Sequence, residues 1–170
     1  MIKRLSILIS LLSIVTAWIL SGQVWAIATI TETQQQISAT ATESYPQIAL
    51  VLTIWLLIIL FSRYVKGFFG KFLLSAVTLL LFATVSPVWF DSAAGNVQIL
   101  SGAITKAVGI SDWQAQQELL TKVYYQHTIA DFFVIAIIVG LISTLFVVWS
   151  GLPKGNASIL ETRVDRLPKW

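Results

Sequence analysis

Cysteine is absent from the sequence, and charged residues are scarce. Without cysteine the chain has no disulfide, no thiolate nucleophile and no cysteine-ligated zinc or iron–sulfur site. Charged residues make up 11% of the 170 residues and hydrophobic residues 56%, against about 25% and about 45–50% in an ordinary soluble domain. A water-soluble fold cannot bury that much apolar surface, so the composition predicts a membrane protein.

Signatures of catalysis are missing as well. The sequence contains no glycine-rich phosphate loop, no His-Glu-x-x-His and no Gly-x-Ser-x-Gly motif, and no nucleophile has a base close to it in the sequence. Basic residues do not interleave with aromatic ones as they do in surfaces that bind nucleic acid. We therefore predict no enzymatic activity, no cofactor, no metal site and no nucleic-acid partner.

Apolar residues gather in four continuous runs close to the ~20 residues that a helix needs to cross a bilayer. The second run is the shortest, and it reaches across the bilayer only if its flanking residues extend it. The predicted fold is an all-α membrane protein with four transmembrane helices, at about residues 5–28, 46–64, 72–90 and 129–149. The chain then forms a single membrane domain, residues 1–170, with external segments 29–45 and 91–128 and a cytoplasmic tail 150–170.

The lysines and arginines are distributed unevenly about these runs. Only Lys106 and Lys122 lie in the connections after the first and third runs. The other nine lie at the opposite ends: Lys3, Arg4, Arg63, Lys66, Lys71, Lys154, Arg163, Arg166 and Lys169. The positive-inside rule then places both termini in the cytoplasm. We expect a multi-pass protein of a bacterial inner (plasma) membrane, in contact with the lipid bilayer and with a membrane-protein partner or a second copy of itself.

The stretch AWILSGQVWAIAT, residues 17–29, ends the first run with two small-x-small sequences that a signal peptidase accepts. The apolar stretch before it is at or beyond the ~7–15 residues of a signal-peptide core, which favours a retained helix. Small residues recur at helical spacing, which allows close helix packing, as Ser10, Ser13, Ala17 and Ser21 in the first run and Ala136, Gly140 and Thr144 in the fourth. The sequence leaves open whether the second set meets another span or a second copy.

The long external segment contains two helix patterns. Four apolar residues form one stripe before a break at Gly109: Val97, Leu100, Ile104 and Val108. Ser111-Asp112-Trp113-Gln114 then fits a capping box that opens a second helix with one shared face, formed by Trp113, Leu120, Val123 and Tyr124. We expect short external helices between the third and fourth spans, lying on the bilayer surface or over the helix ends.

The single histidine, His127, lies four residues before Asp131. On one continuous helix these two side chains are neighbours and can share a proton or help to hold a cation. The stretch from Thr128 to Asp131 also fits a capping box, with Thr128 as the N-cap and Asp131 in the first turn of the fourth span. We prefer the capping interpretation, because one histidine and one carboxylate do not complete a metal site.

The order of these parts resembles the tryptophan-associated (tryptophan-operon) membrane protein family of actinobacteria. The local likeness lies in ISATATESYPQIALVLTIWLLIILFSRYVKGFFGKFLLSAVTLLLFATV, residues 37–85, where a Thr/Ser-rich loop with a proline leads into a span, a basic turn and another span. The resemblance implies four spans, cytoplasmic ends and a gene beside those of tryptophan biosynthesis, with no catalytic residues. The chain departs from the family in being rich in Ile, Ser and Gln rather than in Ala, Gly and Arg.

Two functions fit these observations. The first is a small integral membrane protein without catalytic machinery, which acts as an accessory or interaction component associated with tryptophan biosynthesis. The alternative is a small transporter, or a transporter subunit, for tryptophan or a related metabolite. The expected spans hold almost no ionisable residue, whereas ion-coupled transporters commonly keep one at membrane depth, and this difference favours the first function.

The predicted orientation can be tested in the cysteine-free background. Single cysteines replace Ser38, Ser111 and Ser158, and intact cells are treated with a membrane-impermeant thiol reagent. Because the nine-to-two charge bias places residues 29–45 and 91–128 outside, the first two positions should be labelled and Ser158→Cys should not. Labelling at position 158 alone would show that the orientation is the opposite of the predicted one.

Overall fold

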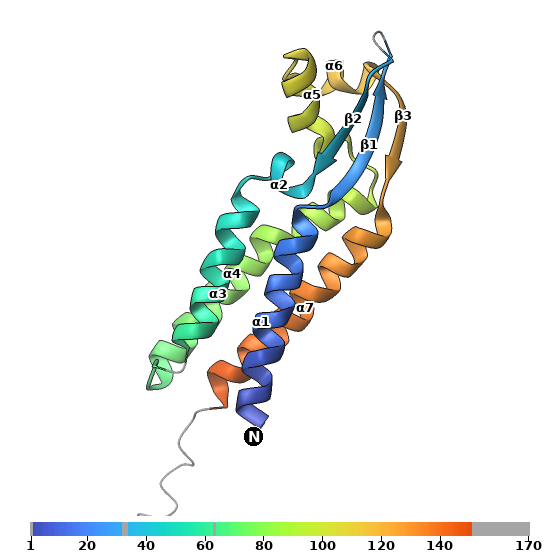
Figure 1. The fold of residues 1–170 in the computed structure, drawn as a ribbon. Coiled ribbons are helices and arrows are strands. Elements are labelled where there is room, and N and C mark those ends of the chain that lie inside the picture. Colours follow the sequence, from blue (N-terminus) through green and yellow to red (C-terminus); the bar gives the residue numbers. More distant parts are fainter. Residues whose placement is uncertain (1, 32–33, 63, 151–170) are drawn as a thin grey trace, which may run out of the picture.

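The computed structural model describes residues 2–31, 34–62 and 64–150. Within them four long helices lie side by side, and the strands and short helices gather at one end of this bundle (Figure 1). The long helices are α1 (Ile2–Ser21), α3 (Gln47–Phe61), α4 (Phe68–Ala93) and α7 (His127–Trp149). The short elements, which we call the cap, are β1 (Val24–Ile30), β2 (Gln36–Thr40), α2 (Ala41–Ser44), η1 (Val97–Leu100), α5 (Ser101–Val108), α6 (Trp113–Glu118) and β3 (Leu120–Tyr125).

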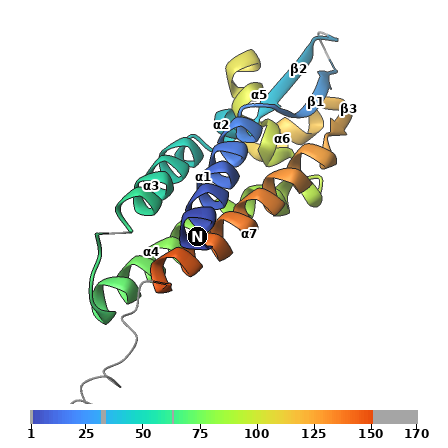
Figure 2. The same ribbon diagram turned by 60° about the horizontal axis from the view of Figure 1, so that its bottom comes forward.

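The bundle confirms a mostly helical protein with membrane-spanning potential. In the described part of the chain, three helices are long and apolar enough to cross a membrane: α1, α4 and α7. Helix α3 has 15 residues, which at ~1.5 Å per residue cover about 22 Å, less than the ~30 Å hydrocarbon layer. Helix α1 contacts α3 and α7, and α4 contacts the same two helices (Figure 2).

The prediction of one helix over residues 5–28 is wrong in its last turns. Helix α1 ends at Ser21, and after Gly22 and Gln23 the chain continues as strand β1. Strand β1 is the middle strand of an antiparallel sheet with the order β2-β1-β3, so the all-α prediction is wrong for the cap. A short apolar run does not distinguish a buried strand from a helix. Strand β2 follows β1 closely in the sequence, but β3, which pairs with its other edge, comes from a distant part of the chain.

The predicted second external helix is also shorter than expected. Helix α6 ends at Glu118, and the chain then forms β3 instead of extending the helix through Tyr124. Valine and tyrosine favour strands, and pairing with β1 provides hydrogen-bond partners for their backbone groups. The N-cap of α6 is Asp112, whose carboxylate accepts a hydrogen bond from the Ala115 N–H at 3.3 Å, one residue after the predicted cap at Ser111.

Other element boundaries agree better with the sequence patterns. Gly109 ends α5 in a left-handed conformation, with φ of 77°, where the sequence predicted a break. Helix α4 begins at Phe68, four residues before the predicted third span. Helix α7 begins at His127, two residues before the predicted fourth span, and ends at Trp149 as expected.

Small residues line the contact between α1 and α7. A methyl group at Gly140 would lie 2.6 Å from the Ile14 Cδ1 atom and 3.3 Å from its Cγ1 atom, so glycine lets the two helices approach closely. Of the residues named above for helix packing, Ser13 is half-buried and the others are buried: Ser10, Ala17, Ser21, Ala136, Gly140 and Thr144. The small-residue face of α7 therefore meets α1 of the same chain.

A buried hydroxyl cluster joins three helices in the bundle. The Ser10 and Thr144 hydroxyls share a hydrogen bond of 2.6 Å, and the Trp55 Nε1–H donates to the Thr144 hydroxyl at 3.1 Å. Thr144 also donates to the Gly140 carbonyl at 2.6 Å. In hydrocarbon each unpaired hydroxyl is costly, so this cluster fixes α1, α3 and α7 relative to one another.

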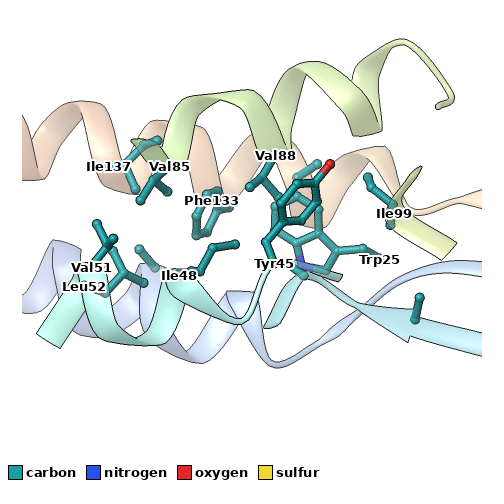
Figure 3. Close-up of a cluster of buried hydrophobic side chains, with 14 of the residues drawn as sticks. Trp25, Tyr45, Ile48, Val51, Leu52, Val85, Val88, Ile99, Phe133 and Ile137 are labelled. Atoms are coloured by element: carbon teal, nitrogen blue, oxygen red, sulfur yellow. The ribbon is translucent and has the colours of Figure 1, made fainter. Parts of the chain in front are cut away.

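The half of the bundle next to the cap has an apolar interior (Figure 3). Trp25 of β1 packs edge-on against Phe133 of α7, with ring centroids 5.1 Å apart. Both side chains are fully buried, and the Trp25 Nε1–H donates to the Leu20 carbonyl at the end of α1 (2.8 Å). Side chains from all four helices and the cap surround them, among them Tyr45, Ile48, Leu52, Val85, Val88, Ile99 and Ile137.

Enlarging Ala17 should separate α1 from its neighbours. Ala17 is fully buried, so Ala17→Leu overpacks the bundle at a cost of about 1–3 kcal/mol, which lowers the melting temperature by several degrees. Ala76 is exposed on α4, and Ala76→Leu is the matched control, expected to leave the melting temperature nearly unchanged. Equal effects of the two substitutions would contradict the assigned packing face.

Candidate functional site

The cap contains a cavity of about 480 Å³, within the range typical of ligand pockets. It lies between η1, α5 and α6 and is lined by Asn96, Val97, Gln98, Ser101, Ser111 and Gln116. The described lining residues carry carboxamide and hydroxyl groups with one valine, and none of these six side chains is ionisable. Carboxamide and hydroxyl groups both donate and accept hydrogen bonds. Gln98 and Ser111 are exposed in this lining, so the cavity suits an uncharged polar group.

The walls of this cavity are held in place by internal hydrogen bonds. Gln116 is only 1% exposed, and its Nε2 donates to the Ile110 carbonyl at 2.7 Å and to the Thr105 hydroxyl at 3.1 Å. Asn96 caps η1, accepting from the Gln98 N–H at 3.1 Å. Side chains fixed in this way lose little conformational freedom when a ligand binds.

Asp91, in the last turn of α4, connects the cap to the bundle. One carboxylate oxygen accepts a hydrogen bond from the Tyr45 hydroxyl, and the other accepts from the Asn96 Nδ2 at 3.0 Å. Tyr45 precedes α3 and Asn96 precedes η1, so three segments meet at this one carboxylate. Nearby, the Ser44 hydroxyl donates to the Ile99 carbonyl, which ties α2 to η1.

A second set of contacts holds β3 to the turn after α4 and the start of α7 to β1. The Tyr125 hydroxyl donates to the Gly95 carbonyl at 2.7 Å, and the Gln126 N–H donates to the Trp25 carbonyl at 2.7 Å. Burial raises the pKa of Tyr125, which keeps the phenol protonated and able to donate. Together with the Asp91–Asn96 bond, these contacts tie the cap to the end of α4 and to the start of α7.

The pKa of Tyr45 is also raised. Burial of the phenol is the largest cause, and the hydrogen bond to Asp91 and the charge of that carboxylate act in the same direction. Each of these effects disfavours the phenolate. The neutral, donating form of Tyr45 is thus the form that the folded protein stabilises.

His127 and Asp131, the site candidates from the sequence, both lie on α7 but have separate partners. The Asp131 carboxylate accepts from the Trp89 Nε1–H of α4 at 3.1 Å, and the exposed His127 ring lies 6.1 Å from the Tyr125 ring. The predicted capping box is wrong, because α7 begins at His127 with Gln126 as its N-cap, which makes no side-chain capping bond. Thr128 is therefore inside the helix, and Asp131 lies beyond its first turn.

Sequence patterns missed the residues that build the cap cavity and its connection to the bundle. Tyr45 and Asp91 are separated by 46 positions, and no periodicity relates them. The only available signal is Asp91 itself, a carboxylate directly after a long apolar run. Gln116 gives no signal, because a glutamine on a short helix is ordinarily exposed.

Within the described residues, no group of three His, Asp or Glu side chains is placed to hold a metal ion. Comparison of the chain with protein-family models, with curated proteins and with solved structures finds no match. The resemblance to the tryptophan-associated family consequently stays a prediction from the sequence.

Replacing Tyr45 by phenylalanine should loosen the cap. A hydrogen bond to a charged acceptor is worth about 1.5–3 kcal/mol, so Tyr45→Phe should lower the melting temperature by several degrees. Tyr124 is 66% exposed on β3, and Tyr124→Phe is the matched control, with an expected change close to zero.

The same pair of variants has a pH signature. Because the folded-state pKa of Tyr45 lies above the ordinary value of about 10, its contribution to stability is complete below pH ~10 and is lost as pH rises further. The melting temperature of the unmodified protein should therefore fall more steeply above pH ~10 than that of Tyr45→Phe. Parallel curves would show that the Tyr45–Asp91 bond does not stabilise the fold.

Proposed function

We propose that this protein is a small integral membrane protein that displays the cap at the membrane surface and acts as an accessory or interaction component without catalytic machinery. The observation that carries the proposal is the hydrogen-bonded connection of the cap to the end of α4, above a bundle whose nearest half is filled with apolar side chains. A cap fixed in this way presents the same surface continuously. Such a surface suits recognition of a partner.

The interior of the bundle supports recognition rather than passage. Beside the cap, Trp25, Leu52 and Phe133 are fully buried, and they belong to one cluster of buried hydrophobic side chains (Figure 3). A solute path through the bundle requires these side chains to separate. The close packing of protein interiors makes such a rearrangement costly.

We further propose four spans with both termini in the cytoplasm of a bacterium. Helix α3 would be the fourth span, because Trp55 and its neighbours pack among three helices that are long enough to cross. Its short length is compatible with spanning if flanking residues extend it or the bilayer thins locally. In this orientation the cap and its cavity face the outside of the cell.

The cap cavity is the place where we expect a partner to bind. Its carboxamide and hydroxyl lining matches uncharged polar groups, such as a peptide backbone of another protein. The resemblance noted from the sequence connects the protein to tryptophan biosynthesis, and the genes that neighbour its own provide an independent check of that connection.

The alternative is a small transporter, or a transporter subunit, for tryptophan or a related metabolite. Uptake and efflux of tryptophan and its precursors are measured in deletion and overexpressing cells. The accessory function predicts no change in either flux and predicts co-purification of a larger membrane protein in fixed stoichiometry. A flux that follows the expression level of this protein would favour the transporter.

A matched pair of variants connects the partner to the cavity. Gln98 is exposed and lines the cavity, whereas the exposed Gln114 lies on α6 and is not part of the lining. Gln98→Arg should reduce co-purification of the partner at least tenfold, since it places an unpaired charge in a neutral site, and Gln114→Arg should have little effect. Equal co-purification of the partner with both variants would show that the cavity is not part of the interface.

A further inference from the structure

Lys71 is buried at the end of the bundle that is remote from the cap. The sequence pattern assigned it to a basic connection between two spans, but it is the fourth residue of α4 and only 4% exposed. Its Nζ atom has no hydrogen-bond partner in the described structure. An ammonium taken out of water without a partner costs several kcal/mol, and a buried charge of this kind in a membrane helix usually marks a functional site.

No described acidic side chain lies near enough to this end to neutralise Lys71. The acidic side chains that the structure places all belong to the cap or to helix turns beside it: Glu43, Asp91, Asp112, Glu118 and Asp131. At the remote end, the Trp149 Nε1–H donates to the Ser75 hydroxyl at 3.0 Å, and that hydroxyl donates to the Lys71 carbonyl at 2.9 Å. These groups satisfy each other and leave the ammonium without an anion.

The first turn of α4 has further unsatisfied donors beside Lys71. Gly67 is the N-cap and makes no side-chain capping bond, so the first N–H groups of the helix, those of Phe68, Phe69 and Gly70, lack intrahelical acceptors. The positive end of the helix dipole lies at the same place. A Cβ atom at Gly67 would meet nothing within 4 Å, whereas one at Gly70 would lie 2.7 Å from the Val65 Cγ1 atom. The open space therefore lies on the Gly67 side of this turn.

The lysine side chain can reach this turn. Lys71 is the fourth residue of α4, and side chains on a helix lean toward its N-terminus, so the flexible four-carbon stem of this lysine extends in the direction of the first N–H groups. A helix N-terminus with converging N–H groups and a cation is a recognised arrangement for binding phosphate.

The surroundings favour a phosphate that belongs to a lipid. Phe68 and Phe69 are 65% and 77% exposed, and such rings are accommodated by acyl chains rather than by water. Phe68 also packs edge-on against Trp149, with centroids 5.7 Å apart, and tryptophan prefers the headgroup level of a bilayer. The N-terminus of α4 thus lies where lipid phosphates are found.

We propose that the first turn of α4 and the Lys71 ammonium bind the phosphate of an anionic phospholipid. The N–H groups of Phe68, Phe69 and Gly70 face the phosphate oxygens, and Lys71 supplies the compensating charge. This lipid holds α4 and α7 together at the end of the bundle that the cap does not reach.

The test compares Lys71→Gln with Lys66→Gln. Lys66 is exposed in the connection before α4, so both variants lose one positive charge at the same end of the molecule. The full-length proteins are purified in a maltoside detergent, which carries no phosphate, and melting temperatures are measured with and without added phosphatidylglycerol. The lipid should raise the melting temperature of the unmodified protein and of Lys66→Gln by several degrees, and that of Lys71→Gln by less than about one degree.

Two further comparisons give outcomes that overturn the proposal. Without lipid, Lys71→Gln should be at least as stable as the unmodified protein, because it removes an unpaired charge. A clearly lower melting temperature would show that Lys71 stabilises the fold itself and would contradict the proposal. Equal stabilisation of all three proteins by phosphatidylglycerol would exclude the site. Inorganic phosphate is compared with chloride at matched ionic strength and should give no Lys71-dependent change in melting temperature. A Lys71-dependent change with inorganic phosphate alone would show that the site binds a free anion and not a lipid.

Discussion

The close contact between α1 and α7 is the constraint on which the rest of the structure depends. These helices come from opposite ends of the described chain, and Gly140 lets them approach until Ile14 fills the space between them. Strand β1 follows α1 within three residues, and β3 ends two residues before α7. The helix contact therefore brings β1 and β3 side by side, and their antiparallel pairing continues it into the cap.

Polarity divides the bundle along its length. Next to the cap, Trp25, Leu52 and Phe133 form an apolar interior, whereas further along α1 and α7 the interior holds the hydroxyls of Ser10 and Thr144. In lipid, apolar side chains gain little by packing against each other rather than against acyl chains, so hydrogen bonds and close contacts contribute more to specificity. The hydroxyl cluster serves this role where the cap no longer holds the helices together.

Sequence periodicity predicted the helices well and the cap poorly. The apolar runs gave the long helices to within a few residues at most of their ends, since run length reflects the thickness of the bilayer. The same signal failed at Val24, because a strand of alternating small and large apolar residues continues the run without a break. Tyr45 and Asp91 were missed because their bond depends on the three-dimensional arrangement of three segments. Lys71 was misassigned because charge patterns count a lysine near a helix end as exposed.

Helix α4 carries at each end a charge that its own dipole disfavours. Asp91 lies in the last turn, where the helix end is negative, and Lys71 lies near the first turn, where it is positive. At Asp91 the structure supplies compensation, because Tyr45 and Asn96 both donate to the carboxylate. At Lys71 the described residues supply none. The two ends of α4 therefore differ in compensation, and the lipid phosphate proposed above would supply at Lys71 what Tyr45 and Asn96 supply at Asp91.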